Sequence, residues 1–221
     1  MKDPTRIPPL LSLVQDLWEA LPDLEFADVL RMLDSAGMQQ LDDEAAAAQL
    51  AKLCAEYPRR LDGRPAVAHV DRWAISVDAQ QVAVRGVHGN PAQPVVWEYD
   101  RIVNGQVGAP LHIVDTSGQH RRFGVVQRIQ PLDVDKLRLE ALPELHRDSI
   151  GDRHYLVELG DGGMLSVGRR LSAFAAYRRH TARESLAWSQ VWQRGEVIEV
   201  RLRDGGGTRS FEPVAHVYHV A

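Results

Sequence analysis

The chain has 221 residues, of which 44% are hydrophobic and 25% are charged, with a formal net charge of −4. This composition is typical of a soluble globular protein that needs no disulfide or metal to stabilise its core. The single cysteine, Cys54, excludes an intramolecular disulfide, and no apolar run reaches the roughly 20 residues that span a bilayer. No signal peptide is recognisable behind Met1, so we expect a cytoplasmic protein without membrane contact and without a cofactor.

The charge is unevenly distributed along the chain. Residues 1–60 hold six Lys/Arg against eleven Asp/Glu, residues 61–164 hold eleven against fourteen, and residues 165–221 hold nine against five. The acidic first part disfavours DNA binding, whereas the basic last part suits an anionic partner. An alternative is that the two oppositely charged ends attract each other.

The first 60 residues predict three short helices, each with one apolar face. Prolines, N-capping aspartates and a glycine stop delimit them. The three predicted helices lie between Pro9 and Pro22, between Asp23 and Gly37, and between Asp42 and Pro58. We therefore expect a small, acidic helical module over residues 1–60.

From Trp73 onward the hydrophobic period changes to two, which is typical of strands. Trp73, Ile75 and Val77 alternate with polar or small residues, and Val82 and Val84 continue the pattern after a short connection, so a hairpin is predicted. Further strand–turn–strand segments follow, with glycines at the turns. The pattern indicates a β-rich domain over 66–221, with a possible division into similar halves at 66–131 and 150–221.

One segment of this β-rich region has helical spacing. Leu171, Phe174, Ala175 and Arg178 recur at three- and four-residue intervals, which predicts one helix near 169–183. The predicted fold is thus α+β: an N-terminal three-helix module followed by antiparallel hairpins that form one or two small barrels or bent sheets.

The densest group of titratable residues is the segment 146–154. His146, Asp148, Asp152 and His154 are ligand types suited to a divalent metal, and Gly151 would allow the loop to fold back. The two arginines of the segment oppose a bound cation. The alternative is a solvated loop with salt bridges before a strand.

A second group is basic and lies within 169–194. It consists of Arg169, Arg170, Arg178, Arg179 and Arg183. Aromatic residues between and after these arginines suit an anion or a single-stranded nucleic acid. The alternative is a solvated helix whose arginines pair with Glu184 and with the acidic helical module.

No catalytic signature is present: the chain lacks a Gly-x-Ser-x-Gly elbow, and Cys54 lies on the apolar face of a predicted helix with only Lys52 as a basic neighbour. We expect a non-catalytic binding or regulatory protein that acts through protein–protein contact or self-association. One alternative is a regulator that binds nucleic acid or an anion through 169–194. Another is a hydrolase or metal-dependent enzyme that uses His112, Asp115, His120 and the segment 146–154.

Overall fold

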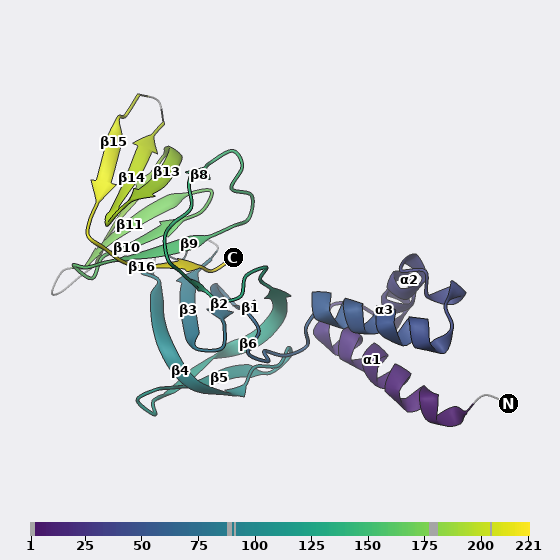
Figure 1. Cartoon of the computed structure of the whole chain (residues 1–221). Helices are drawn as coiled ribbons and strands as arrows, with labels where there is room; N and C mark the ends of the chain where they lie inside the picture. Colours follow the sequence, from purple (N-terminus) through teal and green to yellow (C-terminus); the bar gives the residue numbers. More distant parts are fainter. Residues whose placement is uncertain (1–2, 88–89, 91, 177–180, 204) are drawn as a thin grey trace.

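The computed structural model describes residues 3–87, 90, 92–176, 181–203 and 205–221. The chain is an α+β protein in which strands dominate, as the sequence pattern predicts. Helices come first, a closed β-barrel follows, and a second group of strands completes the chain (Figure 1).

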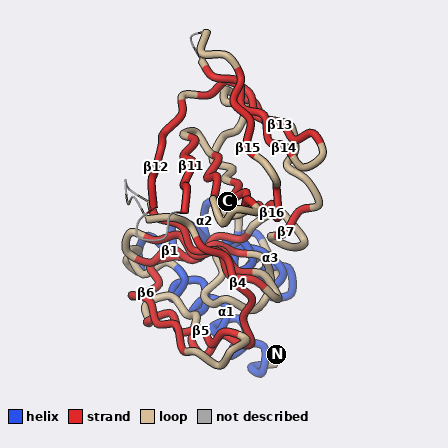
Figure 2. The backbone as a smooth tube through the Cα atoms, turned by 90° about the vertical axis from the view of Figure 1, so that its left-hand side faces the viewer, coloured by secondary structure: helices blue, strands red, loops and turns tan. Residues whose placement is uncertain are grey.

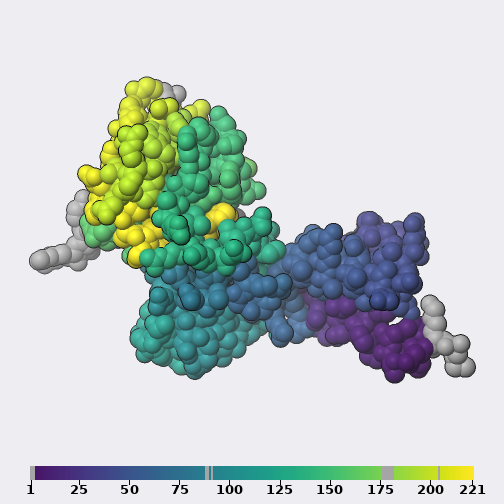
Figure 3. All heavy atoms as spheres, in the orientation of Figure 1, coloured from purple at the N-terminus to yellow at the C-terminus, as the bar shows by residue number. Residues whose placement is uncertain are grey.

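The helices form a small unit, residues 3–60, which we call the helical module. Its elements are η1 (Pro4–Arg6), α1 (Ile7–Ala20), α2 (Phe26–Ser35), η2 (Met38–Gln40) and α3 (Asp43–Glu56). Leu17 of α1 packs against Leu50 and Leu53 of α3. α2 begins later than predicted, at a capping box formed by Glu25 and Asp28 rather than at Asp23. The module projects from the rest of the molecule (Figure 3).

Six antiparallel strands close into the barrel, because the first strand pairs with the last. They are β1 (Ala66–Val70), β2 (Trp73–Val77), β3 (Gln81–Gly86), β4 (Val95–Asn104), β5 (Pro110–Asp115) and β6 (His120–Pro131). Alternate residues such as Val70, Ile75 and Leu111 fill its interior. Figure 2 shows the barrel below the remaining strands.

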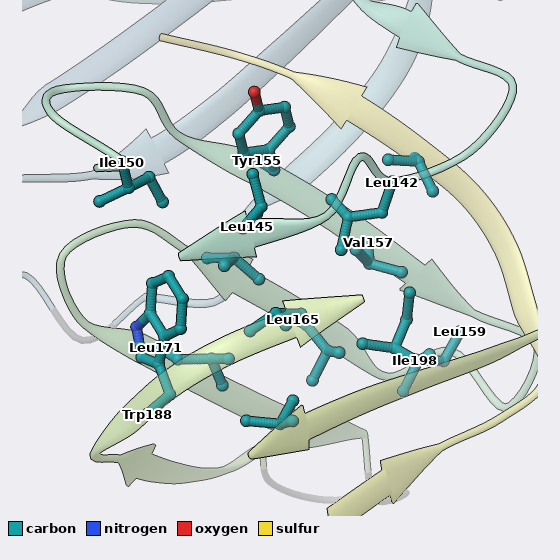
Figure 4. Close-up of a cluster of buried hydrophobic side chains, with 14 residues drawn as sticks. Leu142, Leu145, Ile150, Tyr155, Val157, Leu159, Leu165, Leu171, Trp188 and Ile198 are labelled. Carbon is teal, nitrogen blue, oxygen red and sulfur yellow. The ribbon is translucent and has the colours of Figure 1, made fainter. Parts of the chain in front are cut away.

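The remaining strands form two sheets, which we call the second β unit. They are β7 (Arg138–Leu139), β8 (Leu145–His146), β9 (Tyr155–Leu159), β10 (Met164–Val167), β11 (Leu171–Ala176), β12 (Thr181–Leu186), β13 (Trp188–Arg194), β14 (Val197–Leu202), β15 (Thr208–Phe211) and β16 (Val214–His219). One sheet has the order β12-β11-β10-β9-β16-β7 and the other β15-β14-β13-β8. Leu165, Trp188 and Ile198 lie in the buried core of this unit (Figure 4).

The predicted helix near 169–183 is wrong. β11 and β12 occupy its described part, and residues 177–180, which include Arg178 and Arg179, lie outside the described residues. Leu171 packs into the core of the second β unit, whereas Phe174, on the other face of the strand, packs toward the barrel. Because both faces of β11 are buried, the alternation that reveals a strand is missing from its sequence.

The barrel and the second β unit share a buried apolar contact. It contains Ala83 of the barrel together with Leu137, Leu156, Met164, Phe174, Tyr218 and Val220. Hydrogen bonds between described residues also join the units: Ser76 Oγ donates to the Val220 carbonyl at 2.6 Å, and the Leu137 N–H donates to Asp78 Oδ2 at 2.7 Å. These contacts fix the two units against each other.

The helical module contacts the barrel instead of the basic last part of the chain. The Val107 N–H donates to the Arg59 carbonyl, and the Leu61 N–H donates to the Gly105 carbonyl, both at 2.9 Å. Within the described residues, no ion pair joins 3–60 to 165–221, so the predicted attraction between the two ends is not observed. No helix of the described chain is long and apolar enough to span a membrane.

Candidate functional site

One outer face of the barrel carries basic side chains at the same level on neighbouring strands. Arg85 of β3 lies opposite Ala74 of β2, and Ala74 lies opposite His69 of β1. His69 in turn lies opposite Arg128 of β6. Residues directly opposite each other on antiparallel strands point to the same side of a sheet. Since Val84, the neighbour of Arg85, packs inside the barrel, these four residues, which we call the basic row, face outward.

The basic row forms one wall of a cleft of about 900 Å³ between the barrel and the second β unit. The facing wall comes from the loop before β9 and from the end of β16, which reaches the junction of the two units (Figure 1). Besides Arg85, His69 and Arg128, the cleft is lined by Val67, Gln130, Pro131, Leu132, Asp133, Asp152, Arg153, His219 and Ala221. Side chains from five separate stretches of sequence therefore meet here.

Arg85 is the most unusual of these side chains. Its Nε–H is shielded from solvent and has no hydrogen-bond acceptor among the described residues. Burial lowers the pKa of Arg85 to about 10. Arg85 as a whole is half-buried, but a guanidinium N–H that is shielded from water without an acceptor is unfavourable, so it indicates a site where an anion would be stabilised.

Two further arginines add positive charge to the cleft. Arg153 is positioned by its own loop, because its guanidinium donates to the Ile150 carbonyl at 3.1 Å and to the Ser149 carbonyl at 2.7 Å. Arg128 is exposed on β6. Within the described residues, no ion pair involves Arg85, Arg128 or Arg153. Their charge is therefore not neutralised by a salt bridge.

Two histidines contribute ring nitrogens to the same cleft. His219 stacks on Tyr155 with ring centroids 4.6 Å apart, and its buried Nε2 has no hydrogen-bond partner in the described chain. Burial lowers the pKa of His219; the Ala221 backbone opposes this effect and the charge of Arg153 reinforces it. His69 Nε2 lies 2.8 Å from Gln130 Oε1. The His219 ring can therefore present Nε2 to a ligand.

His154 lies behind the cleft and is not part of its lining. Its Nε2 is 2.8 Å from Ser166 Oγ, and burial, with a further contribution from the charge of Arg85, lowers the pKa of His154 to about 3. The ring is therefore neutral at physiological pH and supports the wall structurally.

The residues predicted as metal ligands do not come together. His146 lies beside Glu144, with Nε2 and Oε1 3.2 Å apart, and the almost fully exposed Asp152 pairs with Arg169 at 3.2 Å. His154 is buried against Ser166, and Asp148 is exposed in the preceding turn. The described residues contain no group of three or more His, Cys, Asp or Glu side chains suited to a metal. The metal hypothesis thus has no geometric support.

The predicted basic set is also dispersed. Arg169 pairs with Asp152, Arg170 is exposed, and Arg183 donates to Ser172 Oγ and lies over the ring of Phe174. Arg178 and Arg179 lie outside the described residues. The described members do not form one continuous surface for a nucleic acid.

The loops considered for an enzyme lie elsewhere on the molecule. His112 Nε2 and His120 Nδ1 are 2.8 Å apart on the β5–β6 hairpin. Asp115 closes the turn of this hairpin, and hydrogen bonds from the Ser117 hydroxyl and the Gln119 N–H hold its pKa below the usual value. Cys54 is half-buried, and burial, with the nearby Asp16, raises its thiol pKa. None of these four residues lines the cleft.

Sequence reasoning missed the basic row because its basic members, His69, Arg85 and Arg128, are separated by at least 16 positions along the chain. The inward Val82 and Val84 imply that Arg85 points outward, but only the strand pairing places it level with His69 and Arg128. Comparisons of the chain with family models, curated proteins and solved structures found no match.

Proposed function

We propose that this chain is a non-catalytic binding protein that holds a small oxyanion in the cleft between the barrel and the second β unit. The observation that carries the proposal is the guanidinium of Arg85, whose shielded Nε–H has no acceptor, which has no ion pair within the described chain, and which lies in a row with His69 and Arg128. A guanidinium fork matches the oxygen atoms of phosphate and carboxylate groups.

The chemistry of the lining favours recognition over covalent catalysis. The described residues that line the cleft include no Ser, Thr, Cys or Lys nucleophile, whereas they include three arginines and two histidines. The volume of the cleft falls within the range of small-molecule sites. A ligand held by Arg85 and Arg153 would contact both units at once, which suits a regulatory protein. We also propose that the protein acts in the cytoplasm, as the single cysteine leads us to expect.

Titration calorimetry of the intact protein with inorganic phosphate tests the proposal. We expect saturable binding that Arg85→Leu reduces at least about tenfold, because a charge-assisted hydrogen bond is lost. Arg122→Leu is the matched control, since Arg122 is exposed on the same strand as Arg128 but lies outside the cleft. Absence of phosphate binding, or an equal loss in both variants, would overturn the proposal.

A second function, contact with another protein, is favoured by an observation on the helical module. Trp18, Phe26 and Leu30 are 38%, 50% and 49% exposed, and the rings of Trp18 and Phe26 lie 5.2 Å apart. Exposed apolar groups that cluster in this way are typical of interaction surfaces. Sedimentation velocity over a range of concentrations tests self-association at this surface. A mass that rises with concentration in the native chain but not in Leu30→Glu would support it, and a concentration-independent mass would exclude self-association.

A further inference from the structure

We infer that the ligand of the cleft is a sugar phosphate, with its phosphate on the basic row and its hydroxyl groups toward Gln130 and Asp133. This inference rests on the proposed function and specifies the ligand class. It follows from the order in which charged and neutral side chains succeed each other along the cleft wall.

The basic row is suited to a phosphate group rather than to a single carboxylate. Arg85 of the row presents one guanidinium group and Arg153 adds a second from the facing wall, while Arg128 lies three strands from Arg85 at the other end of the row. A phosphate monoester carries close to two negative charges at neutral pH and has three acceptor oxygens.

The next level of the same barrel face is neutral. Ala83 lies opposite Ser76, Ser76 opposite Val67, and Val67 opposite Gln130. Ser76 is occupied by its hydrogen bond to the Val220 carbonyl, so Gln130 supplies the polar side chain at this level of the cleft. A ligand that extends from the basic row in this direction therefore meets an uncharged surface with an amide.

Beyond the end of β6 the wall becomes acidic. Pro131 and Leu132 line the cleft next, followed by the exposed carboxylate of Asp133. A carboxylate accepts hydrogen bonds from hydroxyl groups and repels a second anionic group. The sequence of basic row, amide and carboxylate thus favours a molecule that is anionic at one end and rich in hydroxyl groups at the other.

Two other ligand classes fit this order less well. A dicarboxylate of similar length would place its second charge near Asp133, where like charges repel. Free inorganic phosphate would use the basic row alone and would leave the Gln130 and Asp133 positions without a partner. The class we infer uses both parts of the wall.

Calorimetry with glucose 6-phosphate, inorganic phosphate and glucose on the intact protein tests the inference. We expect glucose 6-phosphate to bind about tenfold more tightly than inorganic phosphate, as one or two added hydrogen bonds to Asp133 would provide, and glucose alone to bind undetectably. In Asp133→Asn, the advantage of glucose 6-phosphate should shrink severalfold while the affinity for inorganic phosphate stays the same or rises slightly. Asp135→Asn, two positions away and outside the lining, is the matched control.

The outcomes separate this inference from the proposed function. Equal affinities for glucose 6-phosphate and inorganic phosphate, or an unchanged ratio in Asp133→Asn, would overturn the inference and leave the anion-binding function standing. If neither phosphate compound binds, the proposed function fails and the inference fails with it. Tighter binding of citrate than of glucose 6-phosphate would assign the cleft to carboxylates and overturn the inference alone.

Discussion

The charged side chains at the two ends of the β2–β3 hairpin differ in their hydrogen-bond partners. At the turn, Asp78 Oδ1 accepts the N–H groups of Gln80 and Gln81 at 2.8 and 2.7 Å, and Oδ2 accepts that of Leu137 at 2.7 Å. At the far end of β3, the Nε–H of Arg85 has no acceptor among the described residues. Internal partners compensate the first charge, whereas the second is left for a partner from outside. The contact between the two units is therefore structural at Asp78 and open for binding at Arg85.

The largest loss of stability is expected on substitution of Asp78, whose charge has internal hydrogen-bond partners. Asp78→Ala removes the acceptor of three backbone N–H groups, of which that of Leu137 is deeply buried. We expect the free energy of unfolding to fall by about 3 kcal/mol or more, measured by urea unfolding.

Asp135→Ala is the control for this substitution. Asp135 is exposed and makes no hydrogen bond within the described residues, so its removal should change the free energy of unfolding by less than about 0.5 kcal/mol. Equal effects of the two substitutions would contradict a structural role for Asp78.

An effect of intermediate size is expected in the pH dependence of the free energy of unfolding, and it arises from His154 behind Arg85. The pKa of His154 is lowered to about 3 in the folded chain by burial and by Arg85, whereas an unfolded histidine titrates near 6.5. Below about pH 6.5 the unfolded state therefore binds a proton that the folded state does not bind. Stability should fall by up to about 1.4 kcal/mol per pH unit as pH drops from 6.5 toward 3.

Urea unfolding at several pH values between 7 and 4 measures this dependence. His154→Gln keeps a polar group near Ser166 but cannot titrate, so its free energy of unfolding should decline less steeply with falling pH. Parallel pH profiles for the variant and the native chain would contradict this expectation, because they would show that His154 binds protons equally in the folded and unfolded states.

The smallest change in stability is expected at Arg85 itself, and it should have the opposite sign to that at Asp78. Replacing an uncompensated buried guanidinium with an apolar side chain relieves a desolvation cost. In the absence of phosphate, Arg85→Leu should therefore unfold with a free energy equal to the native value or about 1 kcal/mol higher. A loss comparable to that of Asp78→Ala would mean that Arg85 already has an internal partner, and the contrast between the two ends would disappear.

The sequence pattern predicted the fold class where the two faces of a strand carry different residue types; β2 is buried on both faces, but its outward residues Ala74 and Ser76 are small. The alternation of Trp73, Ile75 and Val77 indicates a strand directly, and β2 confirms it. β11 escaped prediction because Leu171 and Phe174 are buried on opposite faces, so its apolar residues recur without a period of two.

The candidate site was not predictable from local sequence. The search for clustered residues favoured 146–154, where titratable groups are adjacent in sequence but point to different partners, such as Glu144 for His146 and Ser166 for His154. The basic row is instead assembled by three strand pairings, each of which aligns one residue per strand. Strand pairing is a long-range property that one sequence does not specify.

This mode of assembly makes the cleft sensitive to the length of the chain between strands. β1 and β2 are joined by Asp71 and Arg72 alone, and Asp71 adopts a left-handed conformation with φ of 50°. A single residue inserted there would shift the pairing by one position and turn Ala74 and its neighbours on β2 to the opposite face of the sheet. Such an insertion would separate Arg85 from His69 and Arg128 while leaving every basic side chain in the sequence. In a related chain, the lengths of the barrel turns would therefore indicate whether the site is present, in addition to the identities of its arginines.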